Sequence, residues 1–215
     1  MSPSDQTILI DCHYLPCLEY FATVDHFKEI NWEQHEHYAK QSYRNRCRIL
    51  TAQGPMDLII PIKHHASKMK TKDVQIDYGQ KWIHHHWQSI QSAYGKAPFF
   101  PDFSPHIRSL YEAKPRFLMD LNEKFFCLVE KLLGTTFSLK RTTQYLHQTD
   151  NSVQDWRDLI HPKKGQKSNP FYKACTYNQI FGKKFVANLS IIDLLFCEGP
   201  NAITIIKASR VNAEF

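Results

Sequence analysis

The sequence has no long apolar run, few glycines and none of several common catalytic signatures. No stretch approaches the ~20 apolar residues of a membrane-spanning helix, and residues 1–7 lack the positive start and apolar core of a secretory signal. The 7 glycines form no phosphate-binding loop, and the chain contains neither a Gly-x-Ser-x-Gly turn nor a His-Glu-x-x-His helix. We therefore expect a cytoplasmic protein that is not a standard NTPase, serine hydrolase or zinc peptidase.

The cysteines lack any paired spacing. All 6 occur in mostly apolar or aromatic settings, and no two of them form a Cys-x-x-Cys pair. A chain of 215 residues buries enough apolar surface to fold without disulfide bonds, so we interpret the cysteines as reduced core residues. The sequence predicts no bound metal and identifies no cofactor.

Positive charge is in excess but is not concentrated. Lys and Arg number 27 against 21 Asp and Glu, which gives a formal net charge of +6 and a surface that attracts anions. The densest basic segments, residues 63–72 and 163–167, are interpreted as solvated loops. We predict a nucleotide sugar or another small anionic molecule as the ligand, and consider nucleic acid less suited to spread charge.

Apolar spacing predicts an α/β opening. Residues 7–11 form a short β-branched run typical of a buried strand, and residues 18–29 carry apolar side chains at helical spacing. Further strands are expected over residues 30–37, 56–62 and 74–76. Strand, loop and helix in this order begin an α/β unit.

The second half of the sequence is predicted to be mainly helical. Ile83, Trp87, Ile90 and Tyr94 mark one helix face, and the clearest helix begins at residue 115 and ends before Gly134. Residues 149–170 are polar and predict a loop, whereas residues 185–196 are densely apolar and end at a Gly-Pro pair. We predict one α/β domain over residues 1–215, with a small mixed or parallel sheet flanked by helices; its α/β part covers about residues 1–100 and its helical part about residues 101–215.

Two predicted loops carry the best candidate binding residues. Ligands of open α/β sheets usually bind at the carboxyl ends of strands, where the loop after the first strand would lie. Arginine offers planar, bidentate donors for phosphate or carboxylate, and asparagine can bind a hydroxyl. A solvated turn whose arginines cover aromatic surface explains the same residues, and the sequence leaves both interpretations open. The candidates are His13, Tyr14, Tyr20, Tyr43, Arg44, Asn45 and Arg46.

Two histidine-rich segments are weaker candidates. If residues 30–37 form a strand, then Glu33, His35 and His37 share one face, and His35 or Glu36 could act as a base. An exposed polar strand explains these residues equally well. In His84-His85-His86, consecutive helical positions do not face each other, so at most His86 or the adjacent Trp87 enters a site.

Several short motifs, taken together in order and spacing, resemble the WbqC-like protein family over nearly the whole chain. They are Tyr14-Leu-Pro-Cys-Leu-Glu-Tyr-Phe21, Lys40-Gln-Ser-Tyr-Arg-Asn-Arg-Cys47, Ile60-Pro-Ile62, Trp82 with His86-Trp87, Ser92-Ala-Tyr94, Pro98-Phe99-Phe100 and Leu189-Ser-Ile-Ile-Asp-Leu-Leu-Phe196. Many family members have Gln-Pro where this chain has Asp11-Cys12, and Gly where it has Glu19. The Arg-Asn-Arg element of the family is intact as Arg44-Asn45-Arg46.

The resemblance implies a role in making bacterial O-antigen or another surface polysaccharide. We expect an enzyme that transfers an acyl or aminoacyl group to a nucleotide-linked amino sugar. Arg44 and Arg46 would hold phosphate or carboxylate, Asn45 and Tyr14 would orient the sugar, and His13, His35 or Glu36 would act as base. A non-catalytic assembly partner of the polysaccharide machinery and a nucleic-acid binder remain alternatives.

Overall fold

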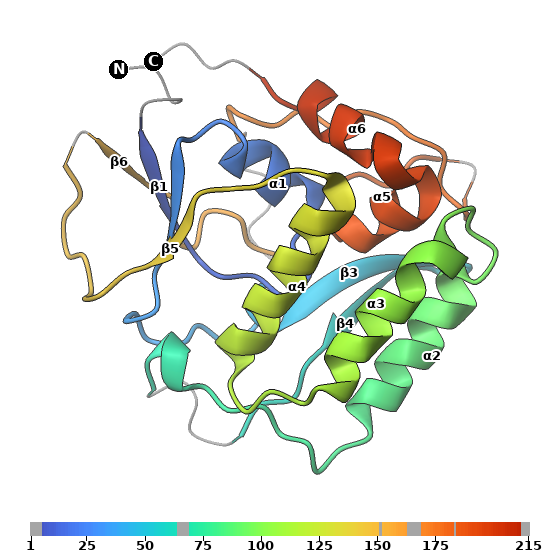
Figure 1. The fold of residues 1–215 in the computed structure, drawn as a ribbon, viewed down its shortest axis with the longest axis horizontal. Coiled ribbons are helices and arrows are strands. Elements are labelled where there is room, and N and C mark those ends of the chain that lie inside the picture. The colour runs from blue at the N-terminus through green and yellow to red at the C-terminus, as the bar shows by residue number, and fades with distance from the viewer. Residues whose placement is uncertain (1–5, 64–68, 151, 163–168, 183, 212–215) are drawn as a thin grey trace.

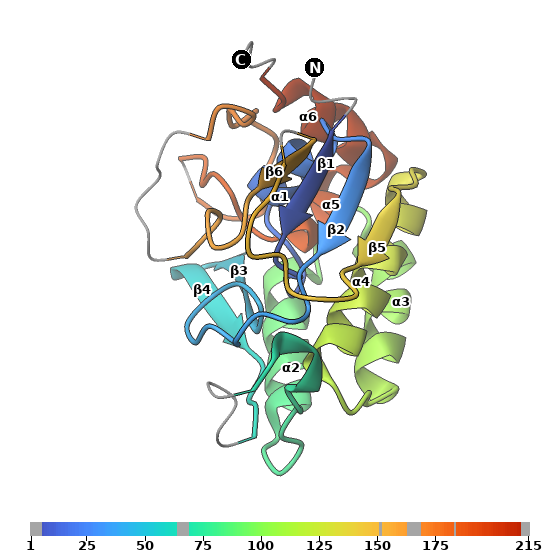
Figure 2. The ribbon, with the colours of Figure 1, turned by 90° about the vertical axis from the view of Figure 1, so that its left-hand side faces the viewer.

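A four-stranded parallel sheet forms one side of the molecule. The computed structural model describes residues 6–63, 69–150, 152–162, 169–182 and 184–211. The strands lie in the spatial order β5-β2-β1-β6, and every neighbouring pair is parallel (Figure 2). This arrangement confirms the predicted α/β fold with a small sheet flanked by helices. The strands are β1 (Thr7–Ile10), β2 (Glu29–Trp32), β5 (Leu139–Arg141) and β6 (Val153–Asp155).

The β1–α1–β2 unit is the one that the sequence predicts, with shorter elements. Helix α1 (Leu18–Val24) ends before the expected residue 29, because residues 29–32 pair with β1 as strand β2. Strand β2 ends at Trp32, opposite the last residues of its neighbours β1 and β5. The expected strand over residues 30–37 is therefore wrong beyond Trp32, and Glu33, His35 and His37 do not share a strand face.

An antiparallel hairpin, separate from the four-stranded sheet, follows β2 in the chain. Strands β3 (Arg46–Thr51) and β4 (Gly54–Ile59) are joined by a tight turn in which Gly54 has a φ of 108°, a conformation that suits glycine. Arg46 thus starts a strand, whereas Arg44 and Asn45 lie just before it. Residues 74–76, predicted as a strand, form only isolated bridges to residues 62 and 117.

Two helices match their predicted positions, and others were missed. Helix α2 (Trp82–Tyr94) and helix α4 (Leu118–Leu133) follow the apolar spacing, and α4 ends at Gly134 in the left-handed conformation. Helix α3 (Phe100–Glu112) was missed because its prolines resemble helix breakers, although Pro101 lies in the first turn, where proline is tolerated. The remaining helices are α5 (Ile191–Glu198), α6 (Ala202–Ala208) and the short 3₁₀ helices η3 (Thr71–Asp73) and η4 (Gly199–Asn201).

The helices lie behind one face of the sheet, and the β3–β4 hairpin lies beyond its edge (Figures 1 and 2). Strand β6 falls within the segment predicted to be a polar loop, residues 149–170, of which residues 151 and 163–168 lie outside the described structure. Residues 64–68 of the first basic segment and all of the second, residues 163–167, also lie outside it. Among the described residues, no helix combines the length and apolar character needed to cross a membrane.

Candidate functional site

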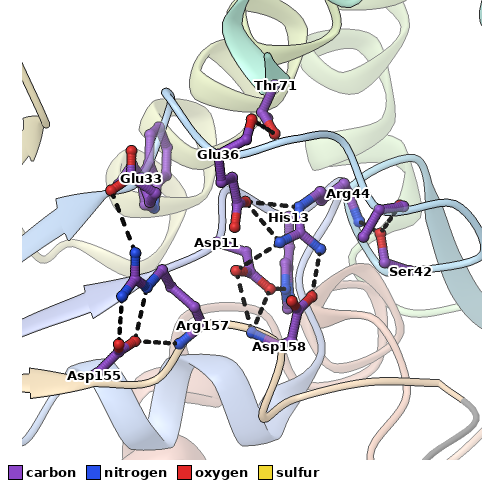
Figure 3. A network of polar contacts seen from close by, with 12 residues as sticks. Asp11, His13, Glu33, Glu36, Ser42, Arg44, Thr71, Asp155, Arg157 and Asp158 are labelled. Carbon is purple, nitrogen blue, oxygen red and sulfur yellow. Dashed lines mark hydrogen bonds and ion pairs between the residues drawn. The ribbon is translucent and has the colours of Figure 1, made fainter. Parts of the chain in front are cut away.

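The carboxyl ends of three neighbouring strands bring acidic groups to one edge of the sheet. Asp11 directly follows β1, Glu36 lies in the loop after β2, and Asp158 lies just beyond β6. Parallel strands in adjacent positions place these loops side by side, as Figure 3 shows. The loop after the first strand, which the sequence predicts to bind the ligand, lies at this edge.

Arg44 joins the three carboxyl groups. Its Nη2 atom lies 2.8 Å from Asp11 Oδ1 and 2.6 Å from Glu36 Oε1, and its Nη1 atom donates to Asp158 Oδ1 at 2.9 Å (Figure 3). The arginine side chain is only 1% exposed. A buried guanidinium with several carboxylates satisfies the need of a desolvated charge for partners. Because acidic groups outnumber the single cation, the cluster favours a ligand that carries an amine or hydroxyl over a phosphate.

The two buried carboxyl groups that contact Arg44 have opposite pKa shifts. Burial alone would raise the pKa of Asp11, but the Arg44 guanidinium and the neighbouring His13 outweigh it and lower that pKa below its ordinary value. Burial raises the pKa of Glu36 to about 8, although Arg44 acts in the opposite direction. At neutral pH, Asp11 is therefore ionised and Glu36 largely protonated. Two carboxyl groups whose pKa values are shifted apart can take different roles, and here Glu36 is the one that can donate a proton.

His13 lies beside Asp11 and has one ring nitrogen without a partner. Its Nε2 atom is 3.5 Å from Asp11 Oδ2, and its Nδ1 atom is buried without a hydrogen-bond partner among the described residues. Burial lowers the pKa of His13, although Asp11 partly offsets this effect. The ring is therefore neutral at pH 7, with the proton on Nε2 facing the carboxylate and a lone pair on Nδ1.

Two of the predicted tyrosines surround His13. The ring of Tyr20 lies 4.8 Å and that of Tyr43 5.5 Å from the imidazole, measured between ring centroids. The Tyr20 hydroxyl donates to the Asp11 backbone carbonyl at 3.0 Å and accepts from the Trp32 indole at 2.8 Å. Both tyrosines are buried, and both pack their rings against His13.

His35, predicted as an alternative base, lies on the β5 side of the site. Its Nε2 atom is 3.1 Å from the Thr142 carbonyl, just after β5, and its backbone N–H donates to Glu33. Glu33 is fully buried, accepts from the Thr142 hydroxyl at 2.9 Å, and lies 3.7 Å from Arg157 (Figure 3). His35 thus belongs to a second polar network next to the Arg44 cluster.

Tyr14 and His86 form a separate buried chain. The Tyr14 hydroxyl lies 3.1 Å from His86 Nδ1 and makes a short contact with the Tyr111 hydroxyl. His86 Nε2 lies 3.1 Å from the Ile59 carbonyl and donates to it, because a carbonyl oxygen can only accept. Burial lowers the pKa of His86 to about 4. The chain links the loop after β1 to helices α2 and α3.

The remaining predicted residues lie apart from the Arg44 cluster. Asn45 donates to the Ile60 carbonyl at 2.8 Å, and Arg46 lies 3.5 Å from Asp57 on the neighbouring strand. Trp87 lines a hollow between α2 and α3. Of the residues predicted from the sequence, the fold thus brings His13, Glu36 and Arg44 together, with Tyr20 and Tyr43 next to His13. The role of Arg44 and Arg46 in holding a substrate phosphate or carboxylate stays a prediction.

Sequence reasoning missed two residues of the cluster. Asp11 was seen as a departure from the family's Gln, and its position directly after a buried strand was the signal that it belonged to the site. Asp158 lay in a segment interpreted as a loop, because β6 is only three residues long. A short strand that pairs with a central one leaves almost no periodic pattern to detect.

Comparisons with known proteins support the resemblance. The profile of the WbqC-like protein family matches residues 12–168 and 166–205. The chain is also 25% identical to uncharacterised protein Rv1507c of Mycobacterium tuberculosis (strain ATCC 25618 / H37Rv) over 139 residues, which cover 64% of this chain and 60% of that relative. The chain therefore spans less than two thirds of the relative's length. No solved structure gives a significant match.

Proposed function

Because the chain belongs to the WbqC-like protein family, we propose that it is an enzyme of bacterial surface-polysaccharide synthesis that transfers an acyl or aminoacyl group to the amine of a nucleotide-linked sugar. The observation that carries this proposal is the pairing of His13 with Asp11, next to the buried Glu36, which shares Arg44 with Asp11. A neutral histidine held by a carboxylate is the usual arrangement of a general base. The resemblance to the family implies the polysaccharide context, and Glu36 and His13 are the proposed acid and base.

The transfer needs one proton removed and one supplied. As the sugar nitrogen attacks the acyl carbon, His13 Nδ1 accepts the proton of the amine, and Asp11 stabilises the imidazolium that forms. The bond from the acyl carbon to its leaving group breaks, and Glu36 donates its proton to that group. Proton transfer from His13 back to Glu36 after product release restores both residues.

The exposed member of the cluster gives the substrate its point of entry. The side chain of Asp158 is 42% exposed, whereas those of Arg44 and Asp11 are 1% and 2% exposed. Asp158 holds a left-handed backbone conformation with a φ of 56° and donates its N–H to Asp11 at 3.1 Å. In the proposed reaction, the amine of the sugar binds at Asp158 and displaces its side chain from Arg44 to reach His13.

Genetic complementation in the organism whose genome encodes the protein tests the proposal even though the acyl donor is not identified. A strain that lacks the gene would carry wild-type protein, His13→Asn, Glu36→Gln or the surface variant Lys96→Gln, at equal protein levels. Mass spectrometry of the polysaccharide would then report its substituents. We expect wild type and Lys96→Gln to restore an acyl or aminoacyl substituent, and His13→Asn and Glu36→Gln to leave it missing.

The same experiment separates the alternatives. A complete polysaccharide in His13→Asn, His35→Ala and Glu36→Ala strains would contradict the enzyme proposal. If surface substitutions alone abolished the polymer, a non-catalytic assembly partner would take its place. A nucleic-acid binder would bind nonspecific DNA at low salt with an affinity that falls steeply as salt increases.

A further inference from the structure

Two adjoining hollows outside the Arg44 cluster combine aromatic and cationic side chains. The first has a volume of about 390 Å³ and lies between α2 and α3, and the second has a volume of about 500 Å³. Tyr78 and Lys114 line both of them, so the two form one groove, called here the α2–α3 groove. Figure 1 shows the two helices side by side, away from the sheet. Hollows of this size accept small molecules of the nucleotide class.

The floor of the groove is apolar and aromatic. Trp87 and Ile83 of α2 and Tyr111 of α3 line it, and Trp87 and Ile83 are partly exposed while Tyr111 is buried. The Arg108 guanidinium lies over the Trp87 ring, with its Cζ atom 5.5 Å from the ring centroid. A planar guanidinium stacked on an indole provides a flat surface on which a heterocycle can stack in turn.

The rim of the groove is positively charged. Five cationic side chains line the two hollows against two acidic ones, Glu112 and Asp77, and Glu112 is already paired with Arg108 at 2.9 Å. Several adjacent lysines and arginines attract a group with more than one negative charge, such as a diphosphate. The cationic residues are Lys63, Lys81, Arg108, Lys114 and Arg116.

We propose that the α2–α3 groove binds a nucleoside diphosphate, with the base on the floor near Trp87 and the diphosphate between Lys81 and Lys114. The inference rests on the proposed function for the choice of a nucleotide-linked substrate. It also assigns the phosphates to a site other than the acidic cluster around Arg44. The moiety has two sources in such a reaction: a nucleotide sugar as acceptor, or a coenzyme A-type donor.

The groove is connected to the loop that carries His13. Tyr111, whose ring lines the groove, contacts the Tyr14 hydroxyl, and Tyr14 directly follows His13 in the chain. The Tyr14 backbone N–H in turn donates to the Tyr43 carbonyl at 2.9 Å, next to Arg44. A ligand that moves Tyr111 therefore acts on the two loops that build the acid and base site.

Calorimetric titration with UDP tests the groove directly. The variant Lys81→Gln/Lys114→Gln removes two groove charges, and Lys96→Gln/Lys124→Gln removes two exposed lysines that do not line the groove. The two pairs change the net charge equally. We expect the groove pair to weaken UDP binding at least tenfold and the control pair to leave it unchanged. Equal weakening by both pairs, unchanged binding in the groove pair, or no UDP binding to wild type would overturn the inference.

Two further measurements test the contact between the base and Trp87 and identify the substrate that carries the nucleotide. We expect Trp87→Leu to lose affinity for UDP but to keep affinity for inorganic diphosphate, with an unchanged circular dichroism spectrum. Displacement of UDP by UDP-N-acetylglucosamine at lower concentration than by acetyl-coenzyme A would identify the acceptor as the source, and the opposite order the donor. Equal loss of UDP and diphosphate binding in Trp87→Leu would contradict the assigned position of the base.

Failure of the groove and failure of the proposed function are distinguishable. If UDP binding is weakened by Asp158→Asn and not by the groove variants, the nucleotide binds at the sheet edge and only the groove inference fails. If the groove variants lose UDP while His13→Asn restores a complete polysaccharide, the groove stands and the acid and base roles fail.

Discussion

Two arginines of this protein, one buried and one exposed, differ sharply in how much their ion pairs contribute to stability. Arg44 is 1% exposed and contacts three carboxyl groups, whereas Arg48 is 37% exposed and pairs with Asp57 alone. Removal of one partner from a buried ion pair costs about 3–5 kcal/mol, and an exposed pair contributes about 0–1 kcal/mol. We therefore expect Arg44→Met to lower the free energy of unfolding by about 3–5 kcal/mol and Arg48→Met by less than about 1 kcal/mol. Urea unfolding at pH 7 measures both, and similar losses would contradict the account.

Glu36 predicts a specific pH dependence of stability. Its pKa is about 8 in the folded protein, against 4.5 as the ordinary value, so the folded state keeps a proton that the unfolded chain releases between these values. Stability from this group is complete below about pH 4.5 and is lost as the pH rises to about 8. The lowered pKa values of His13, His26 and His86 have the opposite effect, which is largest below their unfolded value of 6.5 and fades above it.

From pH 7 to pH 8 the unfolded chain loses its remaining histidine protons, so the opposing slope fades while that of Glu36 persists, and we expect stability to fall with rising pH. Glu36→Gln should reduce this slope, while the exposed substitution Glu112→Gln should retain it. The measurement is the urea midpoint at several pH values across the window. A slope that Glu36→Gln leaves intact would show that the buried carboxyl is ionised in the folded protein.

At the scale of elements, Gly134 illustrates where sequence dictates a helix end. Its φ is 63°, and a Cβ atom built there would meet nothing within 4 Å, so substitution there costs backbone strain without a clash. We expect Gly134→Ala to destabilise the protein by about 1–2 kcal/mol, because the left-handed conformation is unfavourable for residues with a Cβ. Gly134→Asn should cost less, since asparagine tolerates this conformation. Equal midpoints for alanine and glycine in urea unfolding would contradict this account of the cap.

Elements with a strong local pattern could be predicted from the sequence. Strand β1, helices α2 and α4 and the α/β order follow from apolar periodicity and from Gly134. Strands β5 and β6 could not be predicted, because three residues carry no usable period and they form only through pairing with β2 and β1. The same limit hid Asp158, whereas His13, Arg44 and Glu36 were found because they lie near stronger signals.

At the scale of the whole molecule, one continuous core connects the sheet to the last helices. Buried side chains extend from Ile8 in β1 through Phe125 in α4 to Ile206 in α6. The carboxyl group of Asp193 in α5 also accepts from Tyr94 of α2 at 2.8 Å and from Tyr177 at 2.6 Å. We expect one cooperative unfolding transition, with coincident curves from far-UV circular dichroism and tryptophan fluorescence in urea. Two separated transitions would contradict the prediction of a single domain.

The proposed role of His13 as the base requires a neutral ring with a lone pair on Nδ1. Nitrogen-15 NMR of histidine-labelled protein at pH 7 reports the protonation of each ring nitrogen, and His13→Asn identifies the signals by their loss. We predict a single tautomer with the proton on Nε2 and an unprotonated Nδ1. An imidazolium, or the tautomer with the proton on Nδ1, would contradict the assignment of His13 as the base.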